Sequence, residues 1–127
     1  MDINIKTTNI ELTPELSEYL DKRMSAFDKL IDPEDTSVLC TVEVGRTTEH
    51  HQHGNVFRAE VNLHTAGHNF RASSEDETIF IAIDEVQKQI LKELRREKSK
   101  HRRLVRKGSR QVKDFLIGMG GKFRRRR

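Results

Sequence analysis

The sequence has little of what marks a secreted or membrane protein. Its 127 residues include a single cysteine, Cys40, which has no second cysteine with which to form an internal disulfide. No apolar run approaches the roughly 18 residues that a membrane-spanning helix needs. Residues 1–9 are polar and alternating, unlike a signal peptide, in which a basic segment leads into an apolar stretch. We therefore expect a cytoplasmic protein in a reducing compartment, with no membrane partner.

Recognisable catalytic and nucleotide-binding motifs are also absent. The chain contains neither GxGxxG nor GxxxxGK[ST], so the sequence does not support a phosphate-binding loop. His64, His68 and His101 are scattered, and no motif places a serine or cysteine nucleophile to use them. Cys40 falls on the apolar positions of a predicted strand, which favours a buried, inert thiol. We predict no catalytic residues, no cofactor and no small-molecule substrate.

One histidine cluster, His50, His51 and His53, has the residue type that zinc, nickel and copper prefer. It lies in a predicted hairpin loop without a CxxC or HExxH partner, whereas metal sites normally draw their ligands from rigid elements. We favour a solvated polar loop and predict no metal site. A small metal-dependent enzyme built on these three residues is the weaker alternative.

Charge is strongly segregated along the chain. Residues 1–94 hold 9 Lys and Arg against 18 Asp and Glu, a net charge of −9, whereas residues 95–127 hold 15 against 2, a net charge of +13. These values add to the overall net charge of +4. An acidic body with a basic arm is typical of proteins that bind a polyanion, and the low aromatic content of the arm favours nucleic acid over a membrane surface.

Hydrophobic periodicity predicts six elements. Apolar residues that alternate with polar ones indicate four strands, at residues 2–8, 38–44, 57–64 and 70–73. Apolar residues at steps of three and four indicate two helices, at residues 13–31 and from residue 74 to beyond residue 98. Thr13 and Pro14 suit the start of the first helix, and Ser74 with Glu77 has the spacing of a capping box for the second.

The order is therefore strand, helix, three strands, helix. Each helix and the sheet have one apolar face, so we predict a two-layer α+β sandwich with both helices on one face of a four-stranded sheet. We predict one domain over residues 1–100. Residues 101–127, rich in Arg and Gly, are predicted to form a basic tail that stays largely disordered until a partner binds.

Basic residues are the main positive signal for function. On the second helix they face away from the apolar seam and continue beyond it, at Lys88, Lys92, Arg95, Arg96, Lys98, Lys100, Arg102 and Arg103. On the first helix, Lys22 points away from the apolar stripe and Lys29 lies near its edge. Arg23 falls at an apolar angle, so its stem can be buried while its guanidinium emerges beside the second helix. We predict that these residues bind RNA phosphates; for each of the first-helix residues, an ion pair with Asp28, Glu18 or another carboxylate is an equal alternative.

In residues 1–100 the order of elements and several short motifs resemble the hibernation-promoting factor and ribosome-associated inhibitor family, also called ribosomal subunit interface proteins. The motifs are Ile3-Asn4-Ile5, Leu12-Thr13-Pro14, Phe70-Arg71-Ala72-Ser73 and Ala82-Ile83-Asp84. The resemblance implies a β-α-β-β-β-α fold similar to that of double-stranded-RNA-binding domains. It also implies docking on the small ribosomal subunit, in the channel for messenger and transfer RNA, where the protein would silence translation and protect idle ribosomes under stress or in stationary phase.

The resemblance further implies which residues and partners are involved. Arg23, Lys29, Lys92, Arg96, Lys98 and Lys100 would contact phosphates of 16S-type ribosomal RNA, with neighbouring ribosomal proteins as further partners. The chain departs from the family at Thr78, Ile79 and Phe80, where members often carry an aspartate, an apolar residue and a tyrosine, and at Ala26 and Gln89, where basic residues are common. The alternative function is a nucleic-acid-binding regulator that acts off the ribosome, on duplex RNA or in transcription.

Overall fold

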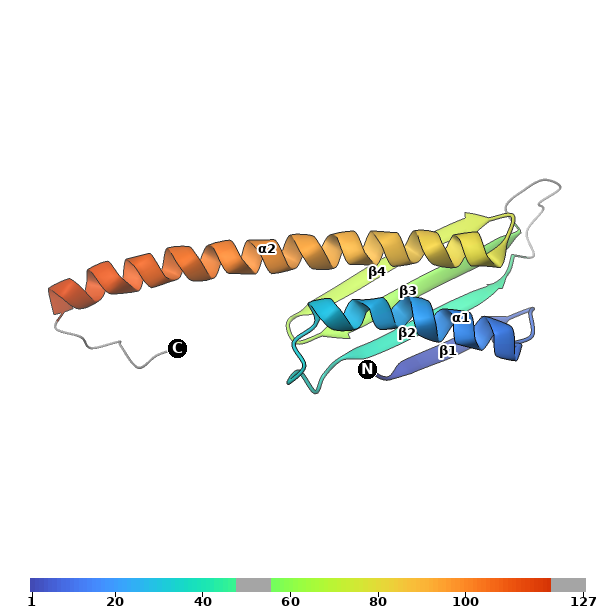
Figure 1. The fold of residues 1–127 in the computed structure, drawn as a ribbon. Helices are drawn as coiled ribbons and strands as arrows, with labels where there is room; N and C mark the ends of the chain where they lie inside the picture. The colour runs from blue at the N-terminus through green and yellow to red at the C-terminus, as the bar shows by residue number, and fades with distance from the viewer. Residues whose placement is uncertain (48–55, 120–127) are drawn as a thin grey trace. The chain divides into compact units, whose positions relative to one another are not determined.

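The computed structural model describes residues 1–47 and 56–119. Four strands and two α-helices follow one another, with a 3₁₀-helix, η1, directly after the first α-helix (Figure 1). Their bounds are β1 Ile3–Thr8, α1 Pro14–Met24, η1 Ser25–Leu30, β2 Leu39–Arg46, β3 Phe57–Thr65, β4 His68–Asp76 and α2 Ile79–Met119. The predicted β-α-β-β-β-α order and the α+β class are confirmed.

The four strands form one sheet in the order β1-β2-β3-β4. β1 is parallel to β2 and the other two pairings are antiparallel. A parallel pair needs a crossover connection, which α1 and η1 supply, whereas β3 and β4 are joined by the tight turn at Gly67, whose φ of +85° suits glycine. The register aligns apolar residues across all four strands, for example Ile5, Val42, Val61 and Ala72.

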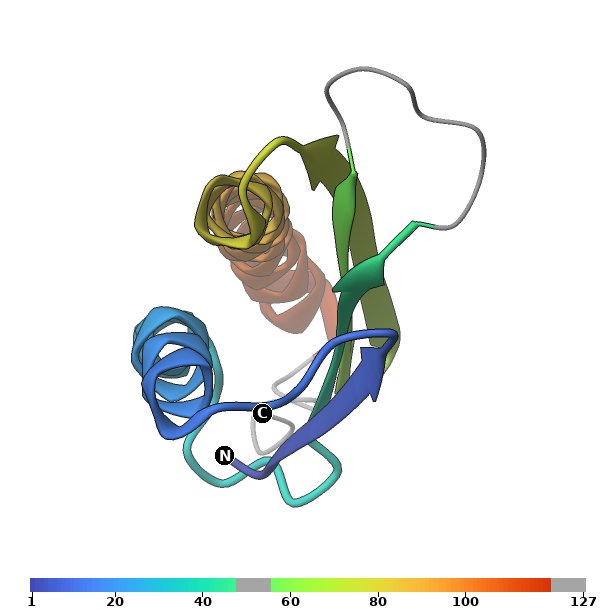
Figure 2. The same cartoon turned by 90° about the vertical axis from the view of Figure 1, so that its right-hand side faces the viewer.

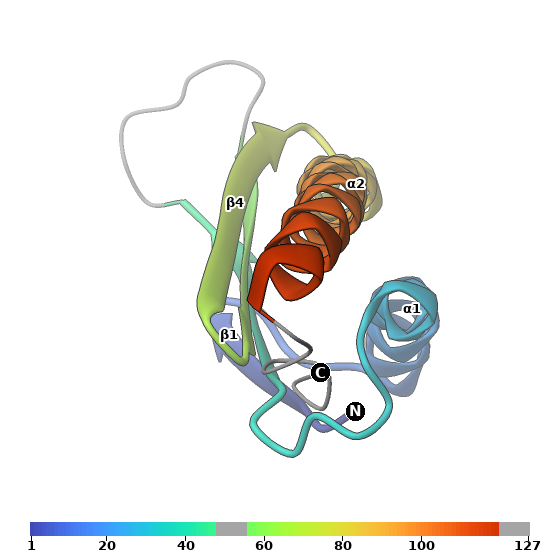
Figure 3. The same cartoon turned by 90° about the vertical axis from the view of Figure 1, so that its left-hand side faces the viewer.

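Both helices pack on the same side of the sheet, as the two end views show (Figures 2 and 3). The core between the layers is apolar: among the residues with described side chains no polar or charged residue is fully buried. The helices contribute Leu16, Leu20, Met24, Phe27, Ala82, Ile83, Val86, Ile90 and Leu94, all of which belong to the predicted apolar faces. The predicted two-layer sandwich is therefore confirmed.

The start of α2 differs from the predicted capping box. β4 extends to Asp76, so Ser74 lies within a strand, where its hydroxyl donates to Glu85 Oε1 at 2.9 Å. The helix begins after Thr78, whose hydroxyl accepts a hydrogen bond from the Ile81 amide at 3.2 Å. Thr78 therefore acts as the N-cap, and the Ser74 and Glu77 prediction is wrong because the fourth strand is longer than its apolar pattern indicated.

The end of α2 also differs from the prediction. The structure continues α2 to Met119, so residues 101–119 are helical, although we predicted that the tail is largely disordered after Lys100. Arg, Lys, Leu and Gln, which have high helix propensity, make up more than half of residues 101–117, and the single glycine there, Gly108, is the strongest helix breaker among them. The chain divides into two compact units, Met1–Leu94 and Arg95–Arg127. The predicted domain boundary at residue 100 stays a prediction.

Candidate nucleic-acid interface

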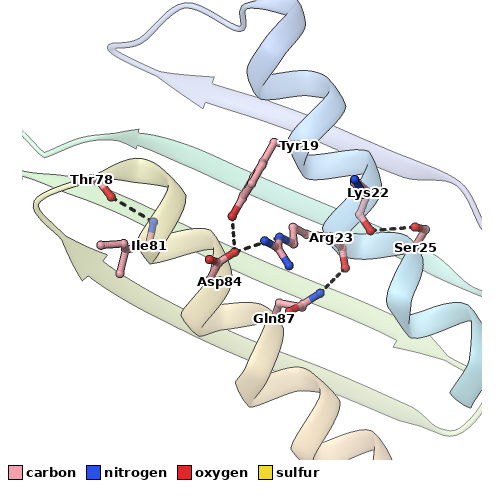
Figure 4. Close-up of polar contacts among 8 residues, drawn as sticks. All are labelled: Tyr19, Lys22, Arg23, Ser25, Thr78, Ile81, Asp84 and Gln87. Atoms are coloured by element: carbon pink, nitrogen blue, oxygen red, sulfur yellow. Dashed lines mark hydrogen bonds and ion pairs between the residues drawn. The ribbon is translucent and has the colours of Figure 1, made fainter.

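The first group of predicted phosphate-binding residues lies on α1 and η1. Lys22 and Lys29 are exposed, as their positions on the predicted helix indicated. Arg23 is half-buried and its side chain lies between α1 and α2, as its apolar angle predicted (Figure 4). The η1 segment is a 3₁₀-helix rather than a continuation of the predicted α-helix, but it keeps Phe27 in the core and Lys29 in solvent.

Arg23 pairs with a carboxylate that sequence analysis did not single out as its partner. Its Nε lies 3.1 Å from Asp84 Oδ1 on α2, and its guanidinium carbon lies 4.9 Å from the centre of the Tyr19 ring. The hydrogen bond with Tyr19 and the charge of Asp84 raise the pKa of Arg23. The predicted ion pair therefore exists, with Asp84 in place of Asp28 or Glu18. The Arg23 side chain nevertheless keeps 41% of its exposure, so it can also contact a ligand.

Tyr19, on α1, contacts two residues of α2. Its hydroxyl donates to Asp84 Oδ1 at 2.6 Å, and its ring meets the Phe80 ring edge-on with the centroids 4.8 Å apart. Burial, and next the hydrogen bond to Asp84, raise the pKa of Tyr19, so the hydroxyl stays protonated at neutral pH. The Gln87 side-chain amide also donates to the Arg23 carbonyl oxygen at 2.9 Å. Side chains from α2 thus hold both the backbone and the guanidinium of Arg23.

The second group of predicted residues lies on α2. Lys88 and Lys92, one helical turn apart, are exposed in the compact unit that ends at Leu94. In the unit that begins at Arg95, the α2 cations whose side chains are described are all exposed; they are Arg95, Arg96, Lys98, Lys100, Arg102 and Arg103. Each of these residues lies on a helix, and none belongs to the buried core. That they bind ribosomal RNA stays a prediction.

The face of the sheet that no helix covers has a different character. Glu60 accepts a hydrogen bond from Arg71 Nε at 2.8 Å and another from Arg58 Nη1 at 3.2 Å, and chiefly the Arg71 bond lowers its pKa. Acidic and basic side chains are therefore paired there. Because the charges on this face offset one another, it is a poorer surface for phosphate than the helices.

Metal and membrane sites find no support in the described part of the chain. The cluster of His50, His51 and His53 lies outside the described residues. Within residues 1–47 and 56–119, no group of three or more histidine, cysteine or acidic side chains is placed to hold a metal ion. In the same ranges, no helix combines the length and apolar character needed to cross a bilayer.

The fold and this surface define a small α+β domain with cations along its two helices. Residues 3–102 match the model of the family described as sigma 54 modulation protein / S30EA ribosomal protein, so the chain belongs to that family. The predicted resemblance is therefore confirmed. Membership of this family places the chain among proteins associated with ribosome hibernation and the ribosomal subunit interface.

Known relatives agree in sequence and fold. A ribosome hibernation promoting factor of Klebsiella oxytoca is 26% identical over 100 residues, which cover 79% of this chain and 96% of that protein. The N-terminal domain of Thermus thermophilus Protein Y superposes with a TM-score of 0.63 at 21% identity, over 76% of this chain and 98% of that one. A ribosomal subunit interface protein from Coxiella burnetii gives 0.60 at 15% identity, over 78% and 99%. These two structures support the fold.

Proposed function

We propose that this protein is a cytoplasmic translation silencer that performs no chemistry. It docks on the small ribosomal subunit in the channel for messenger and transfer RNA, where it blocks initiation and protects idle ribosomes. The observation that carries the proposal is the cationic surface of the two helices in a chain of the hibernation factor family. Its partners are 16S-type ribosomal RNA and neighbouring ribosomal proteins.

The physical basis is phosphate binding that depends on RNA shape rather than on base sequence. Lysine and arginine side chains that neutralise phosphates release counterions, so the logarithm of the affinity falls linearly with the logarithm of the salt concentration. Aromatic residues for base stacking are scarce in the basic segment, residues 95–127, where only Phe115 and Phe123 occur, and this disfavours a reader of single strands. If about six phosphates are neutralised, the slope is roughly −4 to −5.

Sedimentation with ribosomes through a sucrose gradient, at several salt concentrations, tests the proposal. We expect the wild-type chain to co-migrate with the small subunit and with whole ribosomes. Lys92→Ala should weaken binding and reduce the magnitude of the salt slope by about 1, because one phosphate contact is lost. A nearly flat slope would contradict phosphate docking.

Lys6→Ala is the matched control for that variant. Lys6 is also an exposed lysine, but it belongs to the polar positions of β1 and is paired with Glu43 across the sheet. Both variants remove one positive charge, so a difference between them reports position and not net charge. Equal losses for the two would show that the helix face has no special role.

The alternative is a regulator that binds duplex RNA or acts in transcription, away from the ribosome. The family description, which includes sigma 54 modulation, favours considering it. Duplex RNA binding without co-migration would support this alternative and overturn the silencer proposal. Replacing His50, His51 and His53 by alanine should leave ribosome binding unchanged, whereas a metal-dependent enzyme would lose its activity and its metal.

A further inference from the structure

Asp84 is an acidic residue on the surface that we propose binds phosphates, where basic residues are expected. It lies on α2 one turn before Lys88, its side chain keeps 35% exposure, and one of its oxygens faces both Tyr19 and Arg23 (Figure 4). A carboxylate at this place repels an approaching phosphate. If charge alone determined RNA affinity, a neutral residue would serve better here, so the carboxylate should have another effect.

The contacts around Arg23 indicate what that effect is. Asp84 holds Nε, the Tyr19 ring lies against the guanidinium, and Gln87 holds the carbonyl oxygen of the same residue. An arginine without such contacts samples many rotamers, and a ligand must then order it on binding. A guanidinium has five N–H donors, so the contact through Nε leaves donors on the terminal nitrogens for a phosphate.

We infer that Asp84 is a positioning residue, which fixes the Arg23 guanidinium between α1 and α2 so that it meets a phosphate held at a set place in folded RNA. This inference rests on the proposed function and deepens it. Asp84 acts through Arg23 and does not itself touch the RNA. The consequence is selectivity, because a fixed donor favours RNA whose phosphates are already in position, while the negative charge of Asp84 disfavours flexible strands.

Asp84→Asn tests the inference because positioning and charge predict opposite signs. The asparagine carbonyl can still accept from the Tyr19 hydroxyl, but the ion pair with Arg23 is lost. We expect ribosome binding to weaken about three- to tenfold, which lies in the lower part of the coupling range between side chains in contact. Binding to a flexible polyuridine strand should stay the same or become tighter, since the net charge rises by one.

Asp21→Asn is the matched control, since Asp21 is an exposed carboxylate on α1 and its replacement changes the net charge equally. It should not weaken ribosome binding. Tyr19→Phe separates the role of the hydroxyl from that of the ion pair, because it removes the hydrogen bonds of the Tyr19 hydroxyl to Asp84 and Arg23 but leaves the ring and the Asp84–Arg23 pair. It should weaken ribosome binding less than Asp84→Asn does, and thermal unfolding of both variants measures any accompanying loss of stability.

A double-mutant cycle tests whether Asp84→Asn weakens ribosome binding through Arg23. In an Arg23→Ala background, Asp84→Asn should cause no further loss of ribosome binding. Tighter ribosome binding by Asp84→Asn alone, or an undiminished loss in the Arg23→Ala background, would overturn the inference. If Arg23→Ala binds ribosomes as tightly as the wild type, the inference is also overturned. A loss of ribosome binding in Lys92→Ala would in that case still support the proposed docking. Failure of the wild-type chain to co-migrate would instead overturn the proposed function.

Discussion

Arg23 shows how far one residue can be understood from sequence. Its helical angle predicted a buried stem and a guanidinium beside the second helix; in the structure Arg23 is half-buried and its guanidinium lies beside α2, 3.1 Å from Asp84. Its partner could not be predicted, because Asp84 is distant in the sequence and becomes a neighbour only when both helices pack on the same sheet. The contacts of Arg23 with Tyr19 and Gln87 were not predicted either. Tyr19 and Arg23 are four residues apart on α1 and therefore share a helix face, so the spacing could have indicated that pair.

Cys40 illustrates a residue-scale prediction about chemical reactivity. It is fully buried in β2, and desolvation there raises the pKa of the thiol to about 12. Since only the thiolate reacts, we expect no alkylation of the folded protein by iodoacetamide at pH 8, and full alkylation after unfolding in urea. Mass spectrometry measures the label.

The linkage of this thiol to stability has a definite sign. Folding holds the thiol in its protonated form, so its contribution is fully present below the pKa of the unfolded thiol, about 8.5. The contribution is lost as the pH rises from there toward 12. Rapid labelling of the folded chain at pH 8 would show that β2 is not packed as the structure has it.

The residue at which α2 begins was set by the pairing of β4 and not by the local sequence. The capping-box pattern of Ser74 and Glu77 is local, but β4 pairs with β3 as far as Asp76, opposite Phe57. Strand pairing therefore takes Ser74 into the sheet, and the helix begins at the next suitable hydroxyl, that of Thr78. Strand pairing, which is a tertiary interaction, therefore overrode the local capping signal of Ser74 and Glu77.

Thr78→Ala should lower the free energy of unfolding by about 1 kcal/mol, the usual cost of losing a helix N-cap. Ser74→Ala is the matched control, because it removes a hydroxyl of the predicted but unused cap. It loses only an exposed bond to Glu85, so we expect a smaller change of about 0.5 kcal/mol or less. Urea unfolding followed by circular dichroism measures both. A larger loss for Ser74→Ala would favour the original capping box.

At the scale of the whole molecule, charge and compactness divide the chain in nearly the same place. The compact unit ends at Leu94, the last buried residue of the apolar seam, and the positive net charge begins at Arg95. Each part therefore has its own physical character. The body folds around an apolar core, and the remainder of α2 carries exposed cations that the core does not need.

A chain that ends at Lys100 should consequently keep its fold and lose affinity for RNA. Residues 101–127 hold 11 Lys and Arg and one Asp, so their removal changes the net charge from +4 to −6. We expect the melting temperature to stay within about 2 °C of the full chain, because the buried residues among those with described side chains all lie at or before Leu94. Sedimentation should show weaker ribosome binding with a smaller salt slope.

The gradient would also assign the role of the tail. A shift between single and paired ribosomes on its removal would mean that the tail affects ribosome pairing. A marked drop in melting temperature would contradict the expected independence of the body.

The amino-acid sequence was enough to predict the order of the elements, the two-layer packing and the positions of the exposed cations. These properties follow from periodicity and charge, which are local and survive small errors in element bounds. Val61 and Ile90, for example, lie in the core because each shares a face with other apolar residues of its own strand or helix. The start of α2 and the carboxylate that holds Arg23 became known only from the folded structure. Both depend on strand register and helix placement, which bring residues together that no spacing along the chain relates.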